Sequence, residues 1–134
     1  MFEKIVLSSD HGGFSLKETV KDYLINKNFE IEDVGCNSLD PVDYPDFAKI
    51  LSDKLKNNKN VGGILFCGTG IGISMAANRF KHIRAALCTS VEMASKSRKH
   101  NDANVLALGG RILAEDLALN IVEEFLKTDF EARC

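Results

Sequence analysis

The sequence lacks several features that would each assign it to a class of protein. No run of apolar residues approaches the length that spans a bilayer, and no basic leader with a cleavage site opens the chain. Its 17 Lys and Arg residues are outnumbered by 19 Asp and Glu residues, and the net charge of −2 argues against a broad nucleic-acid surface. We therefore expect a cytoplasmic protein with neither a membrane nor a nucleic acid as partner.

Metal and disulfide motifs are also missing. Cys36, Cys67, Cys88 and Cys134 form no C-x-x-C pair, and the three histidines form no H-x-x-x-H pair. Structural zinc sites use such short spacings, and a chain of this size does not need disulfide bridges for stability. The expectation is free thiols in a reducing compartment, with no metal.

A glycine-rich stretch is present, but it does not fit the common phosphate motifs. A Walker loop requires Gly-Lys-Ser/Thr, where this chain has Gly72-Ile73-Ser74. A dinucleotide loop requires G-x-G-x-x-G, whereas these glycines stand at positions 68, 70 and 72. A Cys-x5-Arg phosphatase loop would need arginine at position 73. ATP hydrolysis, NAD binding and cysteine phosphatase chemistry are therefore disfavoured.

The composition and periodicity predict a single α/β domain over residues 1–134. The chain is 45% hydrophobic and 27% charged, which is ordinary for a soluble domain, and it contains no repeat or linker. Short apolar runs alternate with segments of helical period, which predicts a doubly wound (Rossmann-like) five-stranded parallel sheet flanked by helices. The predicted strands are 5–7, 30–34, 61–66, 83–88 and 105–108.

Helices are predicted between all the strands and after the last one. Thr89 and Glu92 form a candidate capping box for a helix from Ser90 to about His100, and another helix is expected from Gly72 to Asn78. The remaining helices are indicated by apolar residues at helical spacing: Leu16, Val20 and Leu24; Phe47, Leu51 and Leu55; and Leu113, Leu117, Ile121 and Phe125.

Ligands of such sheets bind beyond the carboxyl ends of the strands, so functional residues are expected directly after each strand. Cys67 directly follows the third predicted strand and stands before the glycines that open the next helix. Backbone N–H groups and a helix N-terminus suit an anionic intermediate, and a helix N-terminus can lower the ordinary thiol pKa of about 8.5. This predicts a thiolate base for proton abstraction next to a carbonyl. The alternative is a buried structural cysteine.

Other candidate residues also have two interpretations. Asp10 and His11 follow the first strand. The Asp10 carboxylate can orient a sugar hydroxyl and the His11 imidazole can bind an anion, or the two residues can form an Asx turn before two glycines. His100 either takes part in the chemistry or is the cationic end of a helix. Arg111 and Arg133 can bind phosphate in a bidentate fork, but surface arginines are common.

Taken together, five motifs resemble ribose-5-phosphate isomerase type B, in uninterrupted order from Ile5 through Glu131. A D-H-G-G start, a C-G-T-G-x-G-I-S centre and an H-N-D are far more specific together than any one motif. The motifs are Ser9–Phe14, Asp43–Pro45, Cys67–Ser74, Ala76–Arg79 and Arg98–Asp102.

The resemblance implies a role for each candidate. Cys67 would be the base that moves a proton between C2 and C1, Thr69 would shuttle protons between the sugar oxygens, and His100 would open the furanose ring. The backbone of Gly68, Gly70, Ile71 and Gly72 would stabilise the enediolate. Asp10, Tyr44 and Asn101 would bind sugar hydroxyls, and His11 and Arg111 the phosphate end, with Arg133 as a further phosphate ligand. It further implies a homodimer, or a tetramer of paired dimers, with the site between two subunits and no cofactor.

Two features depart from the family's pattern. The usual F-E-G-G-R-H ending appears here as Phe130-Glu131-Ala132-Arg133-Cys134, and the basic tail is absent. Phosphate binding could then fall to Arg111 and His11 alone. Members that lack the cysteine use a glutamate aligned with Ile73, which leaves the base role to Cys67 in this chain.

Two alternatives to a pentose phosphate substrate stay open. One is a hexose-phosphate isomerase of the galactose 6-phosphate or allose 6-phosphate type, because pocket length rather than the catalytic residues separates these substrates. The other is a sugar-phosphate binding module without turnover, which would keep its ligand after Cys67 is replaced.

Overall fold

The computed structural model describes residues 1–132, in which all five predicted strands form one parallel sheet of order β2-β1-β3-β5-β4. The strands are β1 (Lys4–Ser9), β2 (Ile31–Asp33), β3 (Val61–Cys67), β4 (Ala85–Leu87) and β5 (Val105–Gly109). The helices are η1 (His11–Gly13, a 3-10 turn), α1 (Phe14–Asn26), α2 (Tyr44–Leu55), α3 (Ile71–Ala77), α4 (Val91–Lys99) and α5 (Glu115–Lys127).

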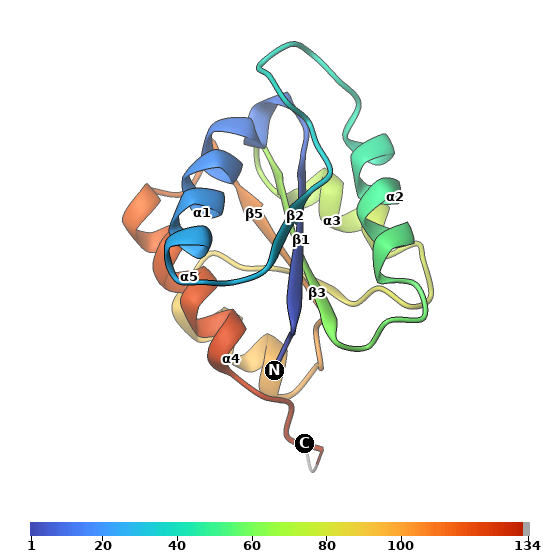
Figure 1. Ribbon diagram of the computed structural model, residues 1–134, viewed down its shortest axis with the longest axis vertical. Helices are drawn as coiled ribbons and strands as arrows, with labels where there is room; N and C mark the ends of the chain where they lie inside the picture. Colours follow the sequence, from blue (N-terminus) through green and yellow to red (C-terminus); the bar gives the residue numbers. More distant parts are fainter. Residues whose placement is uncertain (133–134) are drawn as a thin grey trace.

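Helices cover both faces of the sheet (Figure 1). Alternate residues of β1 point to opposite faces: Ile5 and Leu7 pack with α1, α4 and α5, and Val6 packs with α2 and α3. The central strand β3 is buried along its whole length, as expected for a strand with helices on both sides. The doubly wound prediction is confirmed.

The strand order creates one place where a ligand site is expected. From β1 the chain proceeds to β2 on one side, whereas β3 lies on the other side of β1 and leads toward β5. The carboxyl ends at this switch are level, since Ser9 pairs with Phe66 and Cys67 pairs with Gly109. Loops that follow β1 and β3 therefore flank a crevice of the kind in which doubly wound proteins bind ligands.

Several element boundaries differ from the prediction. Ser90, not Thr89, caps α4: its hydroxyl accepts the Met93 amide at 3.1 Å, and Glu92 lies in the first turn. The outer strands β2 and β4 are three residues long, shorter than predicted, because each has a single neighbouring strand to pair with. Helix α5 begins at Glu115, so Leu113 precedes it. No helix within residues 1–132 has the length and apolarity to cross a membrane.

Candidate active site

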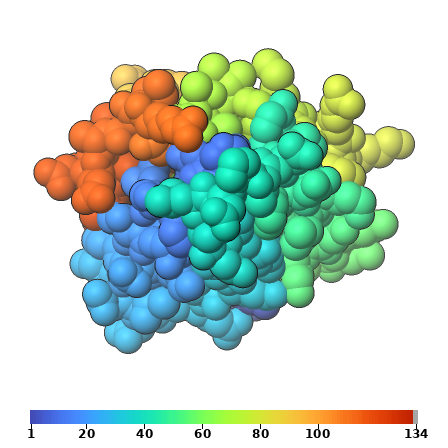
Figure 2. Space-filling view, turned by 90° about the horizontal axis from the view of Figure 1, so that it is seen from above, coloured from blue at the N-terminus to red at the C-terminus, as the bar shows by residue number. Residues whose placement is uncertain are grey.

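The segments that follow β1, β2, β3 and β5 meet at the carboxyl edge of the sheet. Figure 2 looks down on this edge, where the blue, teal, lime and orange parts of the chain come together. Backbone hydrogen bonds join these segments directly: the Asp10 amide donates to Phe66, and the Arg111 amide donates to Gly68. The segments in which functional residues were expected therefore lie together at one edge of the sheet.

Cys67 lies at the floor of this edge with its thiol directed at the start of α3. The side chain is 5% exposed, and its Sγ accepts the Gly70 amide at 3.0 Å. Gly70 has φ +83°, and a Cβ there would lie 2.6 Å from Leu87, so the turn requires glycine. An N–H donated to sulfur at a helix N-terminus stabilises negative charge on that sulfur. The local backbone thus suits a thiolate.

Two of the loop amides predicted to face an oxyanion already have acceptors. The Gly70 amide is bound to Cys67, and the Ile71 amide donates to Thr69 Oγ1 at 3.2 Å. The Thr69 hydroxyl keeps its own hydrogen for donation and is exposed toward solvent. For an enediolate oxygen this loop therefore has the amides of Gly68 and Gly72 to offer, rather than the whole stretch.

Asp10 and His11 are each held by a backbone amide. Asp10 Oδ1 accepts the Gly13 amide at 3.1 Å, so the Asx-type turn considered from the sequence forms, and Oδ2 is left for another partner. The Val42 amide donates to His11 Nδ1 at 3.2 Å. A neutral imidazole with an occupied Nδ1 carries its proton on Nε2 and can donate it to a ligand oxygen.

Arg111 and Tyr44 lie against the glycines of the same edge. A Cβ on Gly12 would lie 3.3 Å from Arg111 Cζ, and a Cβ on Gly68 would lie 3.4 Å from Arg111 Nη1. Likewise, a Cβ on Gly72 would lie 2.8 Å from the Tyr44 ring. The absence of side chains at these glycines lets a guanidinium and a phenol approach the backbone, one on each side of the Cys67 loop.

His100 and Asn101 lie at the opposite edge of the sheet. His100 is the C-cap of α4, its amide donates to the Lys96 carbonyl at 2.9 Å, and its side chain is exposed. Because β5 carries the chain from this edge to Gly109 beside Cys67, the two edges are separated by roughly 13 Å of strand. One chain does not bring His100 to its own Cys67. Arg133 lies outside the described residues.

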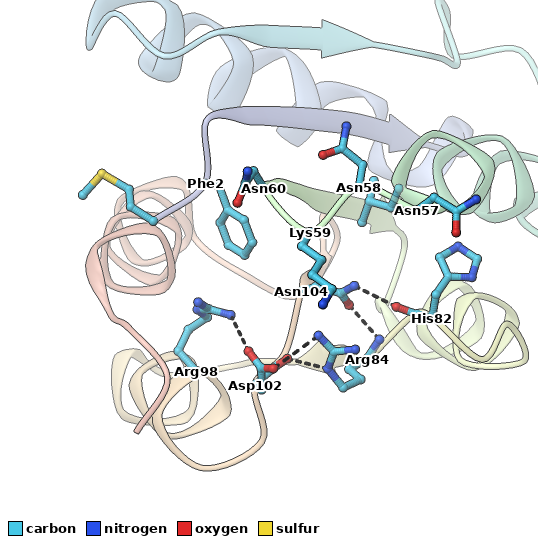
Figure 3. Close-up of a pocket in the computed structure, with 12 residues that line it drawn as sticks. Phe2, Asn57, Asn58, Lys59, Asn60, His82, Arg84, Arg98, Asp102 and Asn104 are labelled. Carbon is cyan, nitrogen blue, oxygen red and sulfur yellow. Dashed lines mark hydrogen bonds and ion pairs between the residues drawn. The ribbon is translucent and has the colours of Figure 1, made fainter. Parts of the chain in front are cut away.

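A cavity of about 540 Å³ also opens at the amino edge (Figure 3). Several of its polar side chains are engaged with the chain itself: Arg84 Nε donates to the Asp102 carbonyl at 2.6 Å, and Asn104 bridges Arg84 and His82. Arg98, 7% exposed, donates to the carbonyls of Thr128 and Ala103. These groups hold loops together, and we do not assign this cavity a catalytic role.

The remaining described cysteines lack the surroundings of Cys67. Cys88 is 1% exposed, and burial raises the pKa of its thiol to about 11, although Ser97 opposes this shift. Cys36 donates to the Ser38 carbonyl at 3.3 Å, as a protonated thiol does. Within residues 1–132 no three His, Cys, Asp or Glu side chains gather in a way that could hold a metal ion.

The model for the ribose/galactose isomerase family matches residues 5–134. The chain belongs to this family. Ribose-5-phosphate isomerase B of Escherichia coli is 42% identical over 129 residues, which are 96% of this chain and 87% of that protein. The resemblance read from the five sequence motifs is confirmed.

Solved structures of family members share the fold. A ribose 5-phosphate isomerase from Thermotoga maritima has a TM-score of 0.95 and 49% identity over 98% of this chain and 91% of its own. Ribose-5-phosphate isomerase B from Mycoplasma genitalium, solved with bound ribulose-5-phosphate, has a TM-score of 0.93 and 44% identity over 96% of this chain and 86% of its own.

Sequence reasoning did not single out Val42, whose amide binds His11, or the buried Lys17. Val42 acts through its backbone amide, which leaves no residue-specific signal. Lys17 is fully buried, and its signal was visible: it lies three and seven residues before Val20 and Leu24, on the apolar face of α1. A lysine on such a face needs a buried carboxylate, which Asp33 supplies.

Proposed function

We propose that this protein interconverts ribose 5-phosphate and ribulose 5-phosphate through an enediolate, as an aldose-ketose isomerase of the pentose phosphate pathway. The observation that supports this most is the Cys67 thiol, placed at the topological switch point and hydrogen-bonded by the Gly70 amide. Membership of the ribose/galactose isomerase family supports the same substrate class.

The proposed chemistry is a proton transfer between two carbons. The Cys67 thiolate removes the C2 proton of the open-chain aldose, the C2–H electron pair forms the C1–C2 double bond, and the carbonyl oxygen takes the negative charge. The resulting enediolate is stabilised by the loop amides, and the thiol returns the proton to C1. Thr69, whose hydroxyl hydrogen is free to donate, moves a proton between the two sugar oxygens.

Binding of the substrate is assigned to the groups around this thiol. Asp10 Oδ2 and the Tyr44 hydroxyl bind sugar hydroxyls, and the His11 Nε2–H and the Arg111 guanidinium bind the phosphate. No acidic side chain within residues 1–132 pairs with Arg111, so its charge is available to an anion.

A second copy of the chain is proposed to complete the site. His100 and Asn101 stand at the amino edge, so a dimer in which each copy presents this edge to its partner's carboxyl edge would bring them to the sugar ring. There His100 opens the furanose and Asn101 binds a hydroxyl. Arg133, which lies outside the described residues, is proposed from the family resemblance as a further phosphate ligand.

The test is isomerisation of ribose 5-phosphate by the wild type, Cys67→Ala and Cys88→Ala. Loss of a general base lowers turnover by about 10²–10⁴-fold, so Cys67→Ala should lose activity and still bind the phosphosugar. Cys88→Ala is the matched control and should keep turnover, because Cys88 packs in the core on the α1, α4 and α5 side of the sheet, whereas Cys67 packs on the α2 and α3 side. Retained turnover in Cys67→Ala would rule out the cysteine mechanism.

Galactose 6-phosphate and allose 6-phosphate should be assayed beside the pentose, because the matched family includes galactose isomerases. Turnover of the hexose phosphates alone would replace the pentose assignment with a hexose-phosphate isomerase. Binding of the phosphosugars without turnover by the wild type would instead identify a binding module.

A further inference from the structure

The loop between β2 and α2, residues 34–43, is attached near both of its ends. At its start, Gly35 accepts the Ser9 amide at 2.6 Å. At its far end, the Val42 amide donates to His11 Nδ1 at 3.2 Å. The tip between these two attachments is exposed. The loop is therefore fixed by hydrogen bonds at its start and near its far end, beside the candidate site.

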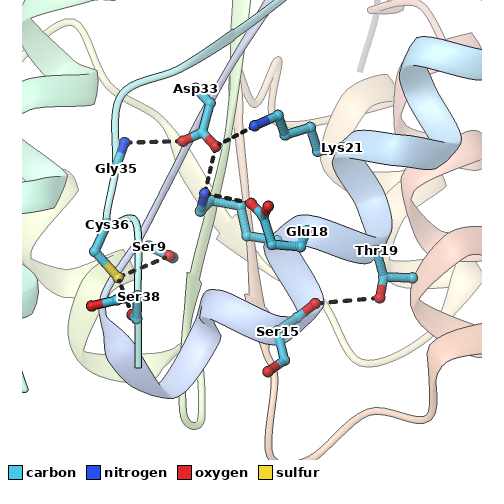
Figure 4. A network of polar contacts seen from close by, with 10 residues as sticks. Ser9, Ser15, Glu18, Thr19, Lys21, Asp33, Gly35, Cys36 and Ser38 are labelled. Atoms are coloured by element: carbon cyan, nitrogen blue, oxygen red, sulfur yellow. Dashed lines mark hydrogen bonds and ion pairs between the residues drawn. The ribbon is translucent and has the colours of Figure 1, made fainter. Parts of the chain in front are cut away.

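Asp33 binds the loop at its start, next to the Gly35 attachment, and the buried Lys17 in turn binds Asp33. Asp33 Oδ1 accepts the Gly35 amide at 3.0 Å, and its Oδ2 accepts from Lys17 Nζ at 2.5 Å and from Lys21 Nζ at 3.0 Å. Lys17 is 0% exposed and also contacts Glu18 at 3.0 Å. Figure 4 shows Asp33 turned toward both Gly35 and Lys21, with Glu18 beside them.

Burial of this ion pair is expensive for the fold. Taking a lysine and a carboxylate out of water costs several kcal/mol for each ion, and apolar side chains of similar volume are often as stable or more so. Stability alone therefore gives a weak reason for a charged pair at this position. The Gly35 contact gives a stronger one, because an apolar residue at position 33 would leave that amide without its acceptor.

We propose that Lys17 and Asp33 are positioning residues of the phosphosugar site. Lys17 orients the Asp33 carboxylate onto the Gly35 amide, and this fixes where the loop 34–43 begins. The inference rests on the isomerase function proposed above, since it assigns the pair to the binding of that substrate.

Two site groups depend on the course of this loop. Val42 holds the His11 imidazole in the tautomer that presents Nε2–H, so a displaced loop frees the ring to turn. Tyr44 follows the loop directly, and its ring lies against Gly72 beside the Cys67 loop. Both groups bind substrate rather than transfer its protons, so a displaced loop should raise KM and leave kcat nearly unchanged.

Two double variants separate positioning from charge. Lys17→Met with Asp33→Asn removes both charges and keeps an oxygen for the Gly35 amide, but no lysine orients that oxygen, so KM for ribose 5-phosphate should rise by about two- to threefold. Lys17→Met with Asp33→Leu removes the oxygen as well, and KM should rise about tenfold or more while kcat changes less than about threefold. Equal KM values for the two variants would overturn the proposal.

Lys54→Met is the matched control. It breaks an ion pair of 2.8 Å with Glu32, the residue next to Asp33 on the same strand, without touching the loop. KM should not change in this variant. A tenfold rise in KM here would show that breaking any ion pair of β2 has the same effect, which contradicts a specific role for Asp33.

Amide hydrogen exchange gives a readout that needs no turnover, and its wild-type measurement needs no variant. In the wild type, the Gly35 and Val42 amides should exchange more slowly than those of the exposed loop tip, and in the leucine variant both should exchange at least about tenfold faster. Fast exchange at Gly35 in the wild type would overturn the inference. If the wild type fails to turn over ribose 5-phosphate, the proposed function fails, yet this experiment still decides whether Asp33 fixes the loop.

Discussion

The buried cysteines Cys67 and Cys88 are expected to differ sharply in reactivity. A thiol with a pKa of about 11 is about one part in a thousand thiolate at pH 8, so Cys88 should react with iodoacetamide at least about 100-fold more slowly in the folded protein than after unfolding in urea. Cys67 should react faster than Cys88, and ribose 5-phosphate should protect it. Peptide mapping by mass spectrometry measures both rates. Equal labelling of Cys88 before and after unfolding would contradict the assignment.

The glycines of the Cys67 loop are not equivalent. Gly70→Ala forces a left-handed alanine whose Cβ lies 2.6 Å from Leu87 and 3.0 Å from the Leu108 backbone, and the free energy of unfolding should fall by about 2–4 kcal/mol. Gly68→Ala is the matched control: its Cβ would meet only the flexible Arg111 side chain at 3.4 Å, so the loss should stay below about 1 kcal/mol. Urea denaturation gives both values, and equal losses would be inconsistent with this structure.

At the level of elements, the contact between α1 and β2 predicts a pH dependence of stability. Burial alone would raise the pKa of Asp33, but hydrogen bonds from Lys17, Gly35 and Lys21 outweigh it and hold the pKa below its ordinary value of 3.8. The stabilisation is therefore fully present above pH 3.8 and is lost as pH falls through the lower folded-state value.

Asp33→Asn tests that dependence. At neutral pH the variant leaves Lys17 buried without its carboxylate and should lose about 3–5 kcal/mol of unfolding free energy relative to the wild type. The difference should shrink as pH falls below 3.8 and through the lower folded-state pKa of the wild-type carboxyl. Urea unfolding at pH 7 and pH 2.5 measures the gap. A gap of constant size would mean that Asp33 is not ionised in the folded protein.

The sequence predicted the type of each element well and their arrangement only in part. Apolar periodicity located the strands and helices, because the buried faces repeat with period two or about 3.6. The order β2-β1-β3-β5-β4 depends on contacts between distant segments that no local pattern encodes. Thr89 and Glu92 have the spacing of a capping box, which predicts Thr89 as the cap of α4. In the structure Ser90 caps the helix, and no capping box forms.

For the site, part of the residue set predicted from the sequence gathers at one edge, but the sequence did not predict which groups each residue faces. Cys67, Arg111 and Tyr44 were found from their place after strands and from family motifs, and the structure brings them to one edge. Only the coordinates show that Gly70 donates to the thiol instead of facing an oxyanion. The position of His100 at the far edge also follows from topology rather than from any motif.

For the whole molecule, a site shared between two copies makes a complementation prediction. Cys67→Ala and His100→Asn proteins, unfolded and refolded together, should form heterodimers in which one site of two has both wild-type side chains. Random pairing then restores about a quarter of the wild-type activity. Activity of the mixture equal to the mean of the two separate variants would place both residues in a site within one chain.

The two outer strands also bear on how the molecule behaves at high concentration. Each is only three residues long, and β2 presents Glu32 and Asp33, whose carboxylates pair with lysines. Exposed strand edges are templates on which other chains can add β-structure, and short, charged edges are the usual protection against this. Both rims of the sheet thus offer only a short edge on which another strand could pair, and the rim at β2 is charged as well.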